Sequence, residues 1–160
     1  LQAEIDRALH PLTRQPAPVH PLRAALQEAM WDDVGVMRTG TGMERGLTRV
    51  AEISDALMDV GVAGDNLAFN LTWHDWLNLR SLCDVSKAIT LAGLARENSR
   101  GAHYREDFPD EGDLDASYFT VITQTGGDLT VRRDPVQFTI IRPGETILPE
   151  NEPETLVAAQ

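Results

Sequence analysis

The sequence lacks the features on which several classes of protein depend. It has one cysteine among 160 residues, Cys83, which excludes an internal disulfide and fits a reducing compartment. Because Cys83 stands among apolar neighbours within a helical pattern, we expect a buried, inert thiol. No apolar run approaches the roughly 20 residues of a membrane span, and the first ten residues have no signal-peptide order. These absences predict a cytoplasmic protein with no direct membrane insertion.

Basic residues are also scarce. Fourteen lysines and arginines stand against 25 acidic residues, which gives a net charge of −11 and an isoelectric point of about 4.6. Nucleic acids and anionic lipid surfaces are recognised by clustered positive charge. The composition therefore argues against both as direct partners.

Short motifs that carry chemistry are missing as well. No predicted strand is followed by G-x-G-x-x-G, and "TGTGMERG" at 39–46 lacks the Lys–Ser/Thr pair of a phosphate loop. The four histidines (His10, His20, His74 and His103) are scattered, and the chain has no C-x-x-C or H-x-x-x-H pair. We therefore expect neither a metal site nor a dinucleotide-binding site.

The chain does contain enough apolar content for one domain. Hydrophobic residues make up 42% of it, which suits a single core at this length. It begins at Leu1 rather than at methionine, which favours a fragment or a processed piece of a longer protein.

Helical periodicity dominates as far as residue 109. A short pattern at 2–9 gives way to a proline-rich lead-in that extends to residue 20. Apolar residues then recur every three or four positions from Pro21 to Met37, from Met43 to Val60 and from Thr72 to Ser99. Thr72 is the expected cap of the last helix, with Asp75 completing a capping box.

Long helices joined by short turns pack antiparallel, so residues 21–109 predict an antiparallel three-helix bundle, similar to a spectrin repeat. The pattern then changes. "SYFTVITQ", "TGGD" and "LTVRR" indicate a hairpin, and "VQFTII" at 136–141 a further strand. The predicted fold is mainly α, with a lead-in at 1–20, the bundle at 21–109, a β-hairpin region at 110–145 and an extended or disordered tail at 146–160.

Some side chains have both a functional and a structural interpretation. Trp31, Trp73 and Trp76 would form a ligand cage in one and pack between helices in the other, and we favour packing. Arg38 and Arg45 flank the glycine turn. We favour a role for them in complementing helix dipoles over an anion site.

The densest run of polar and charged side chains is "SRGAHYREDFP" at 99–109. Arg96 and Arg100 fall in the expected last turn of the long helix, close to its free carbonyl groups, and Gly101 suits the left-handed residue that ends a helix. Arg105 with its two acidic neighbours fits either a surface ion cluster of small energetic value or a buried polar network that docks the helix end onto another domain. The residues alone leave both interpretations open.

Two stretches resemble a known family. "ALQEAMWDDVGVMRTGTGMERGL" at 25–47 is similar to the start of the C-terminal helical domain of succinate dehydrogenase and fumarate reductase flavoproteins, which L-aspartate oxidases share. "ARENSRGAHYREDFP" at 95–109 resembles the second signature of this family, R-x-E-S-R-G-A-H-x-R-x-D-[FY]-P, although Asn98 stands where glutamate is usual. The pair Ala102–His103 is closer to the succinate/fumarate branch.

The resemblance implies an FAD enzyme that moves a hydride between a dicarboxylate such as succinate and the flavin. It also implies that the flavin-binding domain and the catalytic residues precede this region, so no catalytic, cofactor-binding or metal residue is expected here. The expected partners are the FAD-binding domain of the parent and an iron–sulfur subunit, with the parent peripheral to the inner membrane on its cytoplasmic side. The expected docking residues are Arg96, Ser99, Arg100, His103, Arg105 and Asp107.

Two alternatives to this role remain open. One is a stand-alone protein-interaction module that uses the same fold. The other is the equivalent domain of an L-aspartate oxidase, because substrate choice depends on residues outside this chain.

Overall fold

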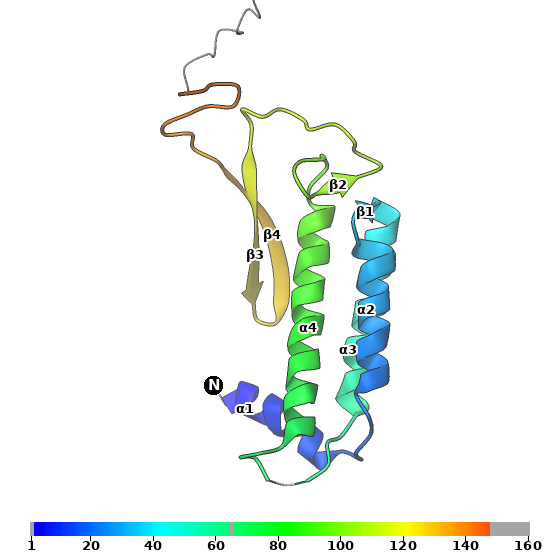
Figure 1. The fold of residues 1–160 in the computed structure, drawn as a ribbon. Coiled ribbons are helices and arrows are strands. Elements are labelled where there is room, and N and C mark those ends of the chain that lie inside the picture. The colour runs from blue at the N-terminus through cyan, green and yellow to red at the C-terminus, as the bar shows by residue number, and fades with distance from the viewer. Residues whose placement is uncertain (1, 65, 148–160) are drawn as a thin grey trace, which may run out of the picture.

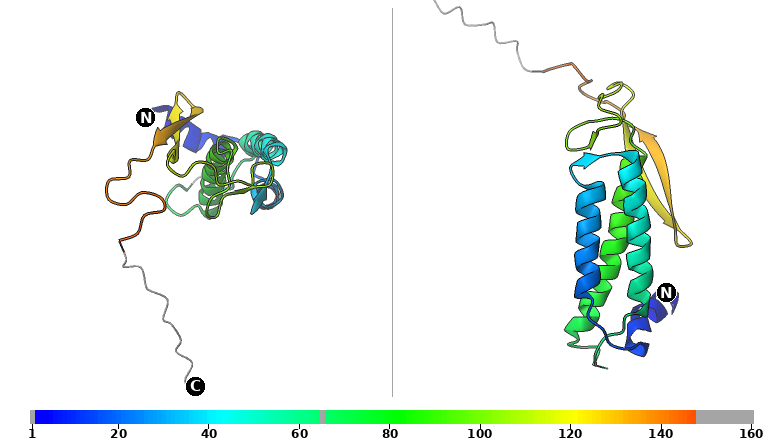
Figure 2. Two further views of the ribbon diagram at one scale, coloured as in Figure 1. Left: turned by 90° about the horizontal axis from the view of Figure 1, so that it is seen from above. Right: turned by 90° about the vertical axis from the view of Figure 1, so that its right-hand side faces the viewer.

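Three long helices form the body of the molecule (Figure 1). The computed structural model describes residues 2–64 and 66–147. Helices α2 (His20–Val34), α3 (Gly40–Asp59) and α4 (Leu71–Leu94) run alternately up and down and lie side by side (Figures 1 and 2). The mainly α fold with a three-helix bundle is confirmed.

Apolar side chains of all three helices meet in one core. The buried members are Leu26 and Ala29 from α2, Val50, Ile53 and Leu57 from α3, Trp76, Leu79 and Cys83 from α4, and Val62 from the loop between α3 and α4. The indole N–H of Trp76 donates to the carbonyl oxygen of Leu57 at 3.0 Å, so this large ring is buried with its polar atom satisfied. The predicted burial of Trp76 and Cys83 is confirmed.

The lead-in packs against the lower end of the bundle. It consists of α1 (Gln2–Leu9) and the 3₁₀ turn η1 (His10–Thr13). The indole N–H of Trp73 donates to the carbonyl of Ala8 at 2.8 Å, and the ring of His10 bonds to the carbonyl of Met58 at 2.9 Å. The short N-terminal helix is therefore held on the bundle, and the predicted packing role of Trp73 is confirmed.

Helix α4 differs from the prediction at both ends. It begins at Leu71 because Asn70, not Thr72, is its cap: the Asn70 side-chain oxygen accepts from the backbone N–H of Trp73 at 3.0 Å. It ends at Leu94 rather than at Ser99. Arg96 and Arg100 are therefore not in its last turn, because the chain after Leu94 forms a loop held by its own side chains.

The turn between α2 and α3 also differs from the prediction. Helix α2 stops at Val34, and Met37–Arg38 form a short strand, β1. Helix α3 begins at Gly40, three residues earlier than expected, because the Thr39 hydroxyl accepts from the N–H of Gly42 at 3.0 Å and caps the helix.

A β-hairpin lies along α4 (Figure 1). Strands β3 (Tyr118–Thr125) and β4 (Asp128–Pro135) pair antiparallel, and Gly126 and Gly127 supply the positive φ values of the predicted turn, 64° and 102°. The further strand expected at 136–141 is wrong, since these residues pair with no strand in the described chain. Most of the tail predicted at 146–160 lies outside the described residues.

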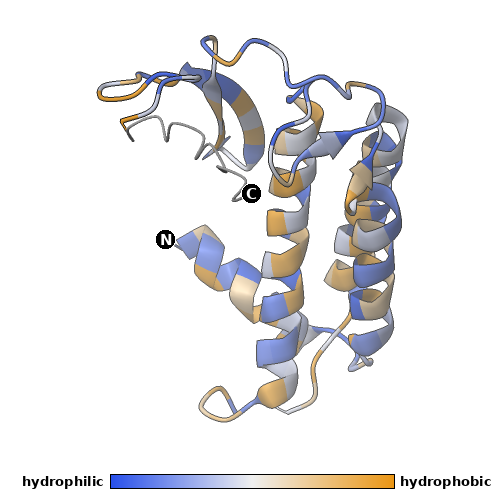
Figure 3. Cartoon of the chain, turned by 45° about the horizontal axis from the view of Figure 1, so that its top comes forward, coloured by the Kyte–Doolittle hydropathy of each residue, from blue (hydrophilic) through white to orange (hydrophobic). Residues whose placement is uncertain are grey.

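Much apolar surface remains uncovered. Figure 3 shows hydrophobic bands along α4, while the loop above the helix ends is largely hydrophilic. Leu82, Val85 and Ile89 on α4 are exposed, as is Trp31, with 77% of its surface accessible. The prediction that Trp31 packs between helices is therefore wrong within this chain. None of the described helices is long and apolar enough to cross a membrane.

Candidate functional site

The run singled out in the sequence forms a loop over the upper end of the bundle. It leaves α4 at Leu94 and includes the short strand β2 (Tyr104–Arg105), which pairs in parallel with β1. The backbone N–H of Glu106 donates to the carbonyl of Arg38 at 2.8 Å. The loop therefore joins α4 to the turn between the other two helices.

Arg105 is the centre of this loop and is 2% exposed. Its Nη1 donates to three carbonyl oxygens at the end of α4, those of Gly93 at 3.2 Å, Leu94 at 3.3 Å and Arg96 at 3.1 Å. Carbonyl groups at the end of a helix lack donors from within the helix, and a cation at this end also complements the helix dipole. The structure therefore shows Arg105 in a buried polar network within this domain and not in a surface ion cluster, while docking of the network onto another domain stays a prediction.

Asp107 completes the network at the other helix. Its two carboxylate oxygens accept from Nε and Nη2 of Arg105, each at 2.7 Å, and Oδ2 also accepts from the backbone N–H of Gly40 at 2.8 Å. Gly40 is the first residue of α3, where a negative charge is favourable. The hydrogen bond from Arg105, followed by that from Gly40, holds the pKa of Asp107 well below its ordinary range.

Ser99 holds the loop from within. Its hydroxyl donates to the carbonyl of Phe108 at 2.8 Å and accepts from the backbone N–H of Arg105, also at 2.8 Å. Ser99 is buried. Both the donor and the acceptor of this hydroxyl are used in hydrogen bonds to the backbone, and no base among the described residues is positioned to activate it as a nucleophile.

Arg100 ties the loop to the segment that leads to the hairpin. Its guanidinium donates to the carbonyl oxygens of Glu111 and Asp113 and to the hydroxyl of Ser117. Gly101, the next residue, has a φ of 56° in the turn between Arg100 and His103. The predicted left-handed conformation of Gly101 is confirmed, but the residue turns the loop instead of ending α4.

His103 is held between two arginines. Nη1 of Arg38 donates to its Nδ1 at 2.8 Å, so the ring proton resides on Nε2, which faces the carbonyl of Arg96 at 3.3 Å. Burial lowers the pKa of His103, and the charges of Arg38, Arg96 and Arg105 lower it further. His103 is thus a neutral, fully engaged structural group.

Two predictions about the arginines of the glycine turn have different outcomes. Nε of Arg38 donates to the carbonyls of Val34 and Gly35 at the end of α2, which confirms its role at a helix end. Arg45 instead pairs with the buried carboxylate of Asp33 at 2.6 Å, because the two helices bring them together. The role predicted for Arg45 at a helix dipole is wrong.

Arg96 differs from the other arginines of the loop. Its side chain makes no hydrogen bond or ion pair with any described residue, and its buried Nε has no acceptor. The guanidinium carbon lies 5.9 Å from the centre of the Tyr118 ring. Both residues line a hollow of about 390 Å³ between the end of α4, His103 and strand β3.

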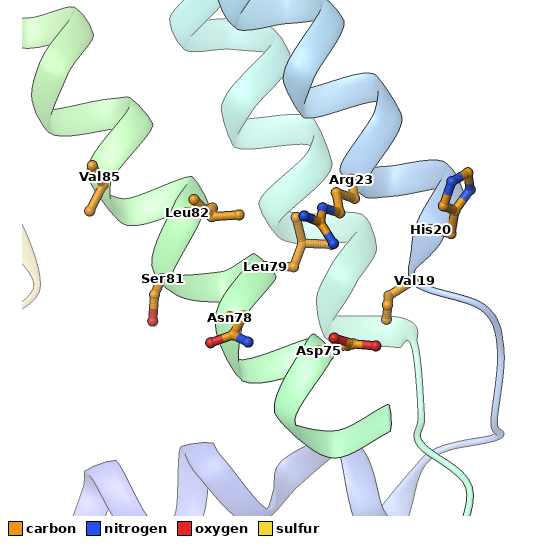
Figure 4. Close-up of a pocket in the computed structure, with 9 residues that line it drawn as sticks. All are labelled: Val19, His20, Arg23, Asp75, Asn78, Leu79, Ser81, Leu82 and Val85. Atoms are coloured by element: carbon orange, nitrogen blue, oxygen red, sulfur yellow. The ribbon is translucent and has the colours of Figure 1, made fainter. Parts of the chain in front are cut away.

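A second hollow lies lower, between α2 and α4 (Figure 4). It measures about 470 Å³ and is lined by Leu79, Leu82 and Val85 on α4 and by Val19, His20 and Arg23 beside or on α2. Its lining also includes Asp75, Asn78 and Ser81 on α4, so aliphatic and polar side chains alternate along the two helices. The groove is an uncovered face of the bundle.

The N-terminus of α3 does not fit the pyrophosphate of FAD. The N-terminus of α3 follows a strand and contains two glycines, but the Asp107 carboxylate already occupies it and would repel a pyrophosphate. Burial raises the pKa of Cys83 to about 11, with a further contribution from Asp84, so its thiol is protonated and inert. No three metal-ligating side chains gather within residues 2–64 and 66–147.

Several contributors to this site were not found from the sequence. Gly40, Arg38 and Thr120 come from segments remote from the loop, and no local pattern links them to it. Arg38 carried a signal as a charged residue at a helix end. Its contact with His103 depends on the pairing of β1 with β2. Strands of two residues are too short to be recognised in the sequence.

Residues 23–150 match the family described as "Fumarate reductase flavoprotein C-term". The chain belongs to this family. It is 31% identical to the fumarate reductase flavoprotein subunit of Mycobacterium tuberculosis over 79% of this chain and 22% of that protein. It is 30% identical to the succinate dehydrogenase flavoprotein subunit of Rickettsia conorii over 80% of this chain and 22% of that protein.

A solved structure agrees with this assignment. Mycobacterium smegmatis Sdh1, in complex with UQ1, superimposes with a TM-score of 0.78 at 27% identity, over 88% of this chain and 24% of that one. The chain is therefore the C-terminal domain of a succinate dehydrogenase or fumarate reductase flavoprotein, and it spans about a quarter or less of the proteins it matches.

Proposed function

We propose that this C-terminal domain has a structural role: it docks onto the FAD-binding domain of its parent flavoprotein and contains no catalytic centre of its own. The network of Arg105 and Asp107 is the observation that carries the proposal. It engages the most chemically active side chains of the signature in holding backbone groups of two helices. Groups so occupied are suited to shaping a surface and not to acid–base catalysis.

The proposed docking residues divide into two sets. Ser99, Arg100 and Arg105 are engaged inside the domain and fix the path of the loop. Arg96, His103 and Asp107 lie nearer its surface: Arg96 faces the ring of Tyr118, and the other two precede the exposed rings of Tyr104 and Phe108 in the chain. Docking then uses the outer side of the loop, which the inner set holds in place.

The resemblance and the names of the relatives support the rest of the proposal. Since the matched relatives are called flavoprotein subunits, we propose that FAD and the chemistry of succinate or fumarate belong to the part of the parent outside this chain. An iron–sulfur subunit is a further proposed partner. The cytoplasmic location, peripheral to the inner membrane, stays a prediction.

The first test is the flavin content of the purified 160-residue chain after incubation with FAD. We expect no bound flavin absorbance and no fumarate reduction with a chemical reductant. Stoichiometric FAD on the folded chain would overturn the proposal, because the chain would then contain a cofactor site.

The alternatives stay distinguishable. A stand-alone interaction module would be encoded without a flavin-binding region, so the coding sequence upstream of Leu1 decides that case. An L-aspartate oxidase parent would share this domain, and its activity would appear with aspartate as the substrate of the complete enzyme.

A further inference from the structure

We propose that the hollow beside Arg96 is a carboxylate-binding site, and that an aspartate or glutamate side chain from the parent protein outside this chain occupies it. The inference rests on the proposed docking role, for which it names the chemistry of one contact. Its evidence is independent of the Arg105 network, since it comes from polar groups that the domain leaves without partners.

Arg96 supplies the main donors. Its Nε is buried and has no acceptor in the described chain, and neither terminal nitrogen forms a hydrogen bond or an ion pair. A buried donor without a partner costs about 1–3 kcal/mol, and more when it is charged. Such a group is expected to have a partner in the assembled protein.

Two more donors border the same hollow. The hydroxyl oxygen of Thr120 on β3 is buried and has no partner among the described residues. Arg38 uses Nε and Nη1 for the end of α2 and for His103, which leaves Nη2 without a hydrogen bond. Three donors from three separate segments therefore border one cavity.

The charge around the hollow is positive, in contrast to the chain as a whole. Acidic residues outnumber basic ones by 25 to 14, yet neither Arg38 nor Arg96 pairs with a described carboxylate. The site therefore lacks an anion, and not merely a hydrogen-bond acceptor.

The geometry favours a carboxylate on a protein segment. A planar guanidinium matches the two oxygens of a carboxylate, as Arg105 already does with Asp107. The walls of the hollow include Ile89 and Phe119, both largely exposed. A free ion would leave these apolar surfaces in water, whereas a polypeptide would cover them.

The source of the carboxylate follows from the size of the relatives. The matched region is 22% of the Mycobacterium tuberculosis relative and 24% of Mycobacterium smegmatis Sdh1. Most of the parent therefore lies outside this chain and is available to supply an acidic side chain. The positive hollow and an acidic residue on the docking partner would be complementary.

Acetate serves as the probe. The 160-residue chain is titrated with sodium acetate against sodium chloride at constant ionic strength, while NMR follows the Nε–H resonances of its arginines. We expect a saturable shift of the Arg96 resonance. Arg96→Gln, followed at the Nε–H resonance of Arg38 on the same hollow, should lower the acetate affinity about tenfold or more, whereas the control Arg132→Ala should leave it unchanged.

A second variant guards against loss of folding. Thr120→Val keeps the shape of the side chain and removes a hydroxyl that has no partner, so stability should not fall, while acetate affinity should drop about threefold. If the folded chain shows no saturable shift at Arg96, the carboxylate site is overturned.

The same titration of the complete flavoprotein tests the carboxylate site separately from the docking role. There the site is expected to be filled, so acetate should no longer shift Arg96. Acetate binding that persists in the flavoprotein would overturn the assignment to a protein carboxylate. The docking proposal fails separately if the chain binds acetate at Arg96 but does not associate with the remainder of the parent.

Discussion

Arg105 and Asp107 form a two-point ion pair that joins the C-terminal end of one helix to the N-terminal end of another. The guanidinium also donates to carbonyl oxygens at the end of α4, and the carboxylate accepts from the first N–H of α3. Each charge therefore sits at the helix end that it complements. Antiparallel packing places the end of α4 beside the start of α3, so one short loop supplies a charged partner to both helix ends.

Arg105→Ala should destabilise the domain strongly. The substitution removes the main partner of the partly exposed Asp107 carboxylate and one donor from each of three carbonyl groups, a loss of about 1–3 kcal/mol. Urea unfolding followed by circular dichroism measures this loss. The matched control is Arg132→Ala, which breaks the exposed pair with Asp134 and should cost about 0–1 kcal/mol. Equal effects of the two variants would contradict the network.

Asp107 should make stability depend on pH in the acid range. Its pKa in the folded state lies below the ordinary value of 3.8, so the unfolded chain binds the proton more readily. The stabilisation is therefore complete above about pH 5 and is lost as the pH falls through and below about 4. The difference in unfolding free energy between the native chain and Asp107→Asn should shrink over that range. A difference that is the same at pH 3 and pH 7 would refute this role.

His103 should titrate below the ordinary histidine value of 6.5, since burial and three neighbouring arginines lower its pKa. A lowered pKa means that its contribution to stability is present above about pH 6.5 and lost as the pH falls. Arg38→Met removes one of these charges and should raise the His103 pKa. NMR titration of the ring protons measures both values, and a midpoint above 6.5 in the native chain would contradict the contacts described.

Gly46 allows α2 and α3 to approach closely. A Cβ atom there would lie 2.9 Å from Cγ2 of Val34 and 3.1 Å from Cβ of Asp33. Crowding of about 1–3 kcal/mol should exceed the gain in helix propensity, about 1 kcal/mol. We expect Gly46→Ala to lower the unfolding free energy and Gly46→Val to lower it further. Thr48→Ala, at an exposed position of the same helix, is the control and should be near neutral.

The sequence was sufficient for the helices and the hairpin because their signals are local. Apolar spacing in α3 and α4 and the "TGGD" turn each act within a few residues. The helix ends were harder, since Asn70 and Thr72 are both good caps and the choice depends on the tertiary position of the loop.

The candidate site was predictable only in part. The residue types of the signature were found, but the sequence did not decide between an exposed cluster and a buried network, because the network also uses Arg38 and Gly40 of the α2–α3 turn, which lie 65 and 67 positions from their partners in the chain. The same limit applies to Trp31. An apolar stripe predicts a contact without naming the partner, and within this chain Trp31 has none that buries it.

The central claim is that the outer side of the loop docks onto the remainder of the parent flavoprotein. Its most direct test is the affinity of the 160-residue chain for that remainder, measured by calorimetry for the native chain and for Tyr104→Ala. Tyr104 is 40% exposed, so the substitution should leave the stability of the chain unchanged and weaken association about tenfold or more, while the control Arg132→Ala has no effect. Association that is unaltered by Tyr104→Ala, or no association at all, would contradict the account.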